Sequence, residues 1–139
     1  IDYKNENVDD MLDKYCPNGV NVYFDNVGGK IADSVINKLA NYARVAVCGV
    51  ISQYNLTEAE SGLRTHRAML TNQATTEGFL VFQFAQKYHI GMDRMAKWIK
   101  EGKIIYKEDI VEGLENAPEA FIGLMNGKNF GKLLIKVSD

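Results

Sequence analysis

Short apolar runs rich in β-branched and aromatic residues alternate along this chain with stretches whose apolar residues recur every three or four positions. The runs 20–24 (VNVYF), 44–50 (RVAVCGV) and 78–84 (GFLVFQF) have the composition of buried strands. The stretches 30–40 and 85–101 have the spacing of one helical face. Strands that alternate with helices form parallel sheets through right-handed crossovers. The sequence therefore predicts an α/β fold with a doubly wound parallel sheet.

Further elements are expected on both sides of this core. Asn7 is a suitable N-cap for a helix that Pro17 and Gly19 end. The later periodicities predict, in chain order, a short helix (64–73), a strand (104–110), a helix (115–125) and a last strand (131–137).

Length and composition exclude several classes of protein. The 139 residues, 46% of them hydrophobic, are enough for one ordinary domain. No apolar run approaches the roughly 18–20 residues of a membrane span, and a formal net charge of −2 gives no basic surface for nucleic acid. The two cysteines, Cys16 and Cys48, are too few for a disulfide framework and fit a reducing compartment. We expect a cytoplasmic protein without membrane or nucleic-acid partners.

Three segments lie where the strands of such a sheet end, and ligands of these folds bind beyond the carboxyl ends of the strands. Segment 25–29 (DNVGG) follows a strand and opens a helix, so its paired glycines and free N–H groups can receive a ligand. Its alternative is a tight strand-to-helix turn. Segment 48–55 (CGVISQYN) is a polar loop in which Gly49 lets a ligand approach the backbone closely. Its alternative is an ordinary surface loop. Segment 127–131 (GKNFG) is a third candidate, or a simple turn.

Other chemistries have less support in the sequence. His66 and His89 are far apart and lack a Cys or second His at metal spacing, and adding Asp93 gives only two neighbouring ligands. Cys48 ends an apolar run and is interpreted as an inert buried thiol. No metal site is predicted.

The same segments, in this order and spacing, resemble the C-terminal part of zinc-independent medium-chain dehydrogenases/reductases. The branch is that of the NADP-dependent prostaglandin, leukotriene and 2-alkenal reductases. The matching stretches cover most of the chain: VYFDNVGG (22–29), ARVAVCGVISQYN (43–55), EGFLVFQF (77–84), EGKIIYKEDIVEGLENAPEAF (101–121) and GKNFGKLLIKV (127–137). The resemblance implies that 1–101 is the C-terminal part of an NADP-binding Rossmann domain. It implies that 102–139 returns to a catalytic, GroES-like domain.

The resemblance also implies an activity and a set of residues. NADPH would reduce the carbon–carbon double bond of a small enone or enal, in an intact protein that is a homodimer. Cofactor-binding roles are implied for Tyr3, Asn26, Cys48, Gly49, Val50, Ile51, Ser52, Gln53, Tyr54, Phe79, Leu80, Val81 and Asn129. Tyr54 is the implied catalytic residue. A phenol with a pKa of about 10 suits hydrogen bonding better than acid catalysis, so we expect Tyr54 mainly to orient.

One departure from the family pattern and one expected gap bear on function. Residues 56–63 (LTEAESGL) stand where the family tends to be rich in Gly and Pro, which leaves the substrate open. The family's glycine-rich diphosphate loop is expected upstream of Ile1, so we expect this chain alone to bind NADPH weakly and to be inactive. Two alternatives remain: a non-catalytic nucleotide-binding module, and a quinone or alcohol oxidoreductase of the same superfamily.

Overall fold

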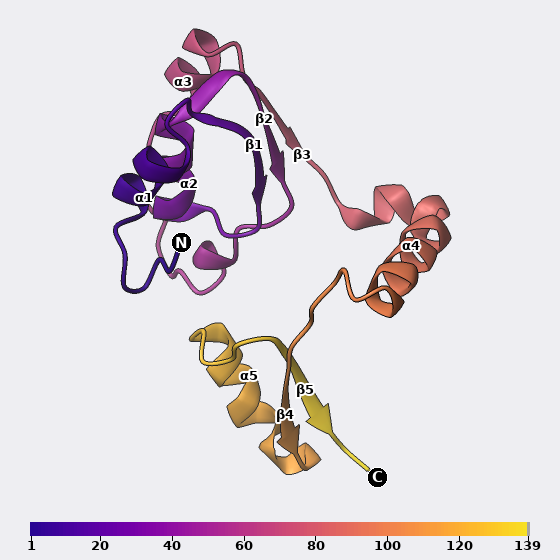
Figure 1. Ribbon diagram of the computed structural model, residues 1–139. Helices are drawn as coiled ribbons and strands as arrows, with labels where there is room; N and C mark the ends of the chain where they lie inside the picture. Colours follow the sequence, from indigo (N-terminus) through magenta and orange to yellow (C-terminus); the bar gives the residue numbers. More distant parts are fainter. Residues whose placement is uncertain (139) are drawn as a thin grey trace. The chain divides into compact units, whose positions relative to one another are not determined.

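The computed structural model describes residues 1–138 and contains two compact units, Ile1–Ala85 (unit 1) and Gln86–Asp139 (unit 2) (Figure 1). Unit 1 holds the elements α1 (Val8–Tyr15), β1 (Val20–Asp25), α2 (Gly29–Asn37), β2 (Leu39–Val47), the 3-10 helix η1 (Ile51–Gln53), α3 (His66–Thr71) and β3 (Thr75–Gly78). Unit 2 holds α4 (Tyr88–Lys100), β4 (Glu108–Glu112), the 3-10 helix η3 (Leu114–Asn116), α5 (Ala117–Met125) and β5 (Lys132–Lys136). The 3-10 helix η2 (Val81–Lys87) crosses the boundary.

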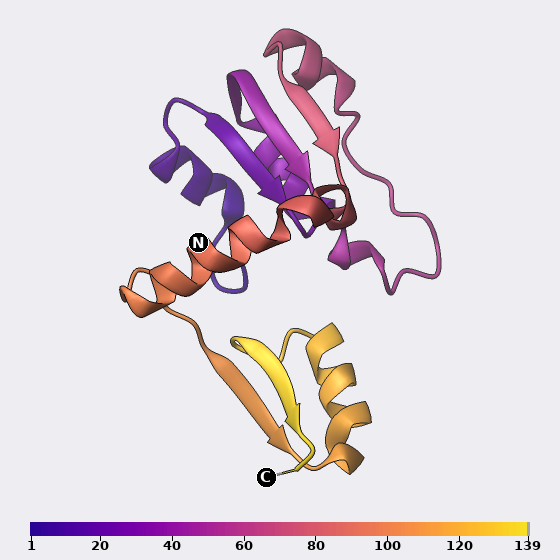
Figure 2. The same cartoon turned by 90° about the vertical axis from the view of Figure 1, so that its right-hand side faces the viewer.

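The sheet of unit 1 is parallel, with strand order β1-β2-β3 (Figure 2). Its register aligns Asp25 with Val47 and Val47 with Gly78, so the three strands finish level with one another. Helices connect the strands, as parallel pairing requires. The predicted α/β class and parallel sheet are confirmed.

Helices α1 and α2 cover one face of this sheet (Figures 1 and 2). Side chains from both helices and from β2 form the core beneath them: Leu12, Val35, Leu39, Ala43 and Val45. The side chains of β1 that point to the opposite face are exposed, with Val22 at 72% and Phe24 at 57%. The core of unit 1 therefore lies on one side of β1, while on the other side the Phe24 ring packs against Phe79.

Helix α1 forms as the sequence predicts. The Asn7 side chain accepts a hydrogen bond of 3.1 Å from the Asp10 N–H and caps the first turn. Asp9 and Asp10 lie at the positive end of the helix dipole and Lys14 at the negative end. Leu12 is the buried residue through which the helix joins the core.

The predicted strand 44–50 is misplaced at both ends, since β2 covers Leu39–Val47. It begins earlier because Leu39 pairs with Val20 across an irregularity in the ladder. It ends earlier because the N–H groups of Cys48 and Gly49 both donate to the Asp25 carbonyl, at 2.8 and 3.1 Å, and turn the chain out of the sheet.

The predicted strand 78–84 is also wrong, because β3 is only Thr75–Gly78. The Phe79 N–H donates to the carbonyl of Val47, the last residue of β2, and beyond that point the strand has no partner. The chain then coils into η2. Its aromatic side chains pack on each other instead, with the Phe79 ring 5.8 Å from both the Phe24 and Phe84 rings, edge to face.

Unit 2 has a two-stranded parallel sheet of β4 and β5 with α5 between them in the chain (Figure 2). The predicted strand 104–110 lies four residues later, because Glu108–Glu112 is the stretch that pairs with Lys132–Lys136. Helix α4 ends before Gly102, whose φ of +68° suits the residue after a helix. No helix within residues 1–138 combines the length and apolarity needed to cross a membrane.

Replacing Leu39 by Ala is expected to lower the free energy of unfolding by about 2–5 kcal/mol, because Leu39 is buried in the core and the change leaves a cavity. The matched control is Leu70→Ala, at a side chain that is 79% exposed. Urea unfolding of the intact protein measures both. Equal losses in the two variants would contradict the core described above.

Candidate functional site

Two of the three predicted segments, 25–29 and 48–55, meet at one edge of the unit 1 sheet, together with residues 79–81, for which the resemblance implies cofactor contacts. The third predicted segment, 127–131, lies in unit 2. Asp25, Val47 and Gly78 are in register at the strand ends, so the residues after them, Asn26, Cys48 and Phe79, begin neighbouring connections. We call these connections the turn (25–29), the loop (48–54) and the exit segment (79–81). The parallel register brings the three together without any contribution from their side chains.

The turn folds around the buried carboxylate of Asp25. Its Oδ1 accepts hydrogen bonds from the Tyr23 hydroxyl at 2.8 Å and from the N–H groups of Val27 and Gly28, each at 2.9 Å. Gly28 has a φ of +69°, which residues with a side chain rarely adopt. A Cβ at this position would also lie only 3.0 Å from Cγ1 of Val50. The turn therefore requires both the acceptor at 25 and the glycine at 28.

The loop is tied to the turn by a ladder of main-chain hydrogen bonds. Besides the two bonds to Asp25, Ile51 N–H donates to the Asn26 carbonyl at 3.1 Å and Ser52 N–H to the Val27 carbonyl at 3.0 Å. The Ser52 hydroxyl adds a bond of 2.6 Å to that same Val27 carbonyl. The turn and the loop thus form a single hydrogen-bonded body.

Tyr54 closes the loop on itself. Its hydroxyl accepts a long hydrogen bond of 3.5 Å from Val50 N–H, and a Cβ placed on Gly49 would lie only 3.3 Å from the same hydroxyl. Because Gly49 has no side chain, there is room for the Tyr54 phenol at this position. Tyr54 is 61% exposed, so the ring remains open to a ligand.

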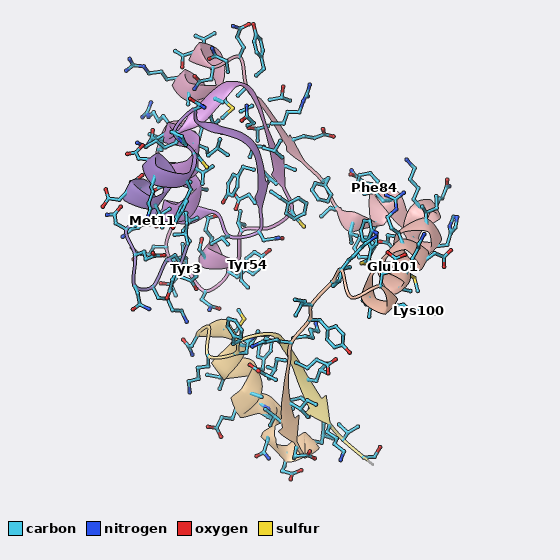
Figure 3. All side chains as sticks on the ribbon, viewed as in Figure 1. Tyr3, Met11, Tyr54, Phe84, Lys100 and Glu101 are labelled. Carbon is cyan, nitrogen blue, oxygen red and sulfur yellow. The ribbon has the colours of Figure 1, made fainter. Side chains whose placement is uncertain are left out.

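The other unit 1 residues predicted to bind are also open. Asn26 is exposed, and its carboxamide makes no hydrogen bond within the described residues. Tyr3 is 58% exposed. Figure 3 shows Tyr3 and Tyr54 at the end of unit 1 where β1 and β2 finish. These side chains leave polar groups available at the same end of the sheet.

The prediction that the Cys48 thiol is buried is wrong, because the structure leaves Cys48 exposed. The cause is the early end of β2 at Val47, which makes Cys48 the first residue of the loop rather than part of the sheet. Its main chain, not its sulfur, holds the loop to Asp25.

Three residues beside the candidate site, Tyr23, Phe24 and Asp25, were not among the predicted binding residues, although Asp25 opens the predicted segment 25–29. Asp25 has a local signal, because an Asp that starts a turn commonly accepts from the N–H two residues later. Tyr23 has a weaker signal, because residues two positions apart in a strand lie on the same face, which puts Tyr23 beside Asp25. Burial raises the pKa of the Tyr23 phenol well above its ordinary value, and the hydrogen bond to Asp25 and the charge of that carboxylate add to the rise. The contact between Phe24 and Phe79 depends on the fold and has no local signal.

Asn129, the last of the predicted cofactor-binding residues, belongs to unit 2. Its side-chain N–H donates to the Gly131 carbonyl at 2.7 Å, and the next residue, Phe130, donates its N–H to the carboxylate of Asp109. Asn129 therefore shapes a turn before β5. Its role toward a cofactor stays a prediction.

Comparison with known proteins decides the family. Residues 1–135 match the family model described as zinc-binding dehydrogenase. The chain belongs to that family. It is 43% identical over 139 residues to the NADP(+)-dependent 2-alkenal reductase of Nicotiana tabacum, with 99% of this chain and 40% of the relative covered. It is 41% identical over 143 residues to the NADPH-dependent curcumin reductase of Escherichia coli, with 99% and 41% covered.

The chain is also similar to a solved structure. The crystal structure of CurA from Vibrio vulnificus in complex with NADPH superposes with a TM-score of 0.91 at 41% identity, covering 100% of this chain and 43% of that one. The chain therefore spans about two-fifths of the length of the proteins it matches.

The family description names zinc, and the described residues do not fit such a site. Within residues 1–138 no group of three or more His, Cys, Asp or Glu side chains is arranged to hold a metal ion. His66 begins α3 in unit 1, and His89 lies in α4 of unit 2.

Replacing Gly28 by Ala is expected to lower the free energy of unfolding by about 1–2 kcal/mol, because the alanine must adopt a positive φ. It is also expected to speed amide hydrogen exchange in the loop, since the new Cβ pushes on Val50. Gly78→Ala is the control, because a Cβ there meets nothing within 4 Å. A Gly28 variant as stable as the Gly78 variant would contradict the turn geometry.

Proposed function

We propose that the protein carrying this chain is an NADPH-dependent reductase that reduces the carbon–carbon double bond of small α,β-unsaturated carbonyl compounds. The observation that carries the proposal is the meeting of the turn, the loop and the exit segment at one sheet edge. These are the segments to which the family resemblance gives cofactor roles. The names of the relatives, a 2-alkenal reductase and a curcumin reductase, support the substrate class.

The residues at this edge suit a nicotinamide cofactor. No side chain caps the N-terminus of α2, and the Asn26 carboxamide beside it is available to a ribose or amide group. Leu80 and Val81 are 65% and 52% exposed, and with Phe79 they offer apolar surface to a flat ring. NADPH, when bound, supplies the hydride.

Tyr54 has an orienting role in this proposal. Its exposed hydroxyl can donate to a ribose hydroxyl or to the substrate oxygen on which negative charge develops, while it still accepts from Val50 N–H.

The proposal extends to the organisation of the intact protein. Residues 1–101 are assigned to the NADP-binding Rossmann domain, and residues 102–139 to a segment that returns to a GroES-like catalytic domain. The intact protein is proposed to be a cytoplasmic homodimer that contains the diphosphate loop outside this chain. Asn129 is proposed to contact the cofactor from the second of these segments.

The intact protein is expected to consume NADPH when a 2-alkenal is added and to release the saturated aldehyde. Loss of NADPH absorbance measures the rate, mass spectrometry identifies the product, and the corresponding saturated aldehyde is the control substrate. An allylic alcohol as product, or turnover with quinones alone, would assign the protein to the other oxidoreductases of the superfamily. Tight NADPH binding without turnover of any of these substrates would make it a binding module.

Replacing Tyr54 by Phe is expected to lower kcat/KM about fivefold, because it removes one orienting hydrogen bond worth about 1 kcal/mol. Steady-state kinetics of the intact protein measures the change. Tyr15→Phe is the matched control, since Tyr15 is also 61% exposed but lies at the end of α1 away from the loop. A loss above about 100-fold would indicate proton transfer by Tyr54 instead. Unchanged kinetics would remove Tyr54 from the site.

A further inference from the structure

Asp25 is the one charged or polar residue classed as buried among residues 1–138, at 5% exposure. A buried carboxylate is costly unless hydrogen bonds replace its water. Asp25 has them, because Oδ1 accepts from one hydroxyl and two main-chain N–H groups, each within 2.9 Å. Its surroundings are therefore built to hold a carboxylate at this point.

The same residue also holds the loop, through its main chain. The Asp25 carbonyl accepts from Cys48 N–H at 2.8 Å and from Gly49 N–H at 3.1 Å. The side chain of Asp25 thus fixes the turn and its carbonyl fixes the start of the loop. A movement of the Asp25 peptide shifts both together.

Groups predicted to bind the cofactor are linked directly to Asp25. Asn26 is the next residue, and its carbonyl accepts from Ile51 in the loop while its carboxamide makes no bond within the described residues. Tyr54 follows in the same loop, with its hydroxyl on Val50 N–H. Asp25 itself is buried, so it acts on a cofactor by placing these neighbours rather than by contact.

We propose that Asp25 is a positioning residue, which sets the place of Asn26 and of the loop toward the nicotinamide end of NADPH. The inference rests on the proposed function and adds to it a residue that touches neither cofactor nor substrate. Small displacements of binding groups change rates strongly, and about 1 Å can cost about 100-fold. The carboxylate therefore acts on cofactor affinity and turnover as well as on folding.

The test compares three variants of the intact protein. Asp25→Ala is expected to raise KM for NADPH about tenfold and to lower kcat about tenfold, because the N–H groups of Val27 and Gly28 lose their acceptor. Asp25→Asn keeps an acceptor oxygen of the same reach and is expected to stay within about threefold of the unchanged protein. Tyr23→Phe removes one hydrogen bond from the same carboxylate but leaves the N–H groups of Val27 and Gly28 their acceptor, so KM for NADPH is expected to stay unchanged.

A second measurement does not depend on turnover. Amide hydrogen exchange without NADPH is expected to quicken in Asp25→Ala at Cys48, Gly49, Ile51 and Ser52, and to stay unchanged in Tyr23→Phe at those amides. If Asp25→Ala does not fold, Asp25→Glu takes its place, because its longer side chain keeps the charge but displaces the acceptor. That variant is expected to show the same rise in KM and the same exchange.

Several results would overturn the proposal. One is an Asp25→Ala protein with unchanged KM for NADPH and unchanged exchange at the loop amides. Another is a Tyr23→Phe protein whose KM rises as much as that of Asp25→Ala, since the role would then be general stability. Absence of turnover in the unchanged protein would count against the proposed function alone, because the exchange comparison still decides whether Asp25 places the loop.

Discussion

The main-chain hydrogen bonds that join β1 to β2 and β2 to β3 run in parallel register, so the three strands finish level with one another. The position of the candidate site follows from that alignment. The turn, the loop and the exit segment leave the sheet side by side because Asp25, Val47 and Gly78 are neighbours. The buried Asp25 then converts two of these neighbouring connections into one hydrogen-bonded body.

The class of fold and the place of the site could be predicted from the sequence, because both depend on local patterns. The apolar runs around Val22 and Val45 indicated strands, and Asn7 indicated the start of α1. Gly28, after a strand and before a helix, marked the turn in which it has a positive φ. The rule that ligands bind beyond the carboxyl ends of parallel strands then placed the candidate site at the edge where these strands end.

The ends of the strands could not be predicted in this way, since pairing decides them. Nothing local to Phe79 or Leu80 distinguishes them from strand residues, and they leave the sheet because β2 has already ended at Val47. The exposure of Cys48 has the same origin. The role of Asp25 could not be predicted either, because it joins a local turn to a loop more than twenty positions away along the chain.

The ladder between the turn and the loop has a consequence for how such proteins diversify. Its bonds from Cys48, Gly49, Ile51 and Ser52 are main chain to main chain, so the exposed side chains of Cys48 and Ile51 can change without breaking them. Gly49 and Ser52 are more restricted, because a Cβ on Gly49 would approach Tyr54 and the Ser52 hydroxyl bonds the Val27 carbonyl. The path of the loop and its chemical character are therefore set separately. Mutation can alter the groups that the loop presents to a ligand while the backbone beneath them keeps its course, which allows new preferences to arise without rebuilding the scaffold.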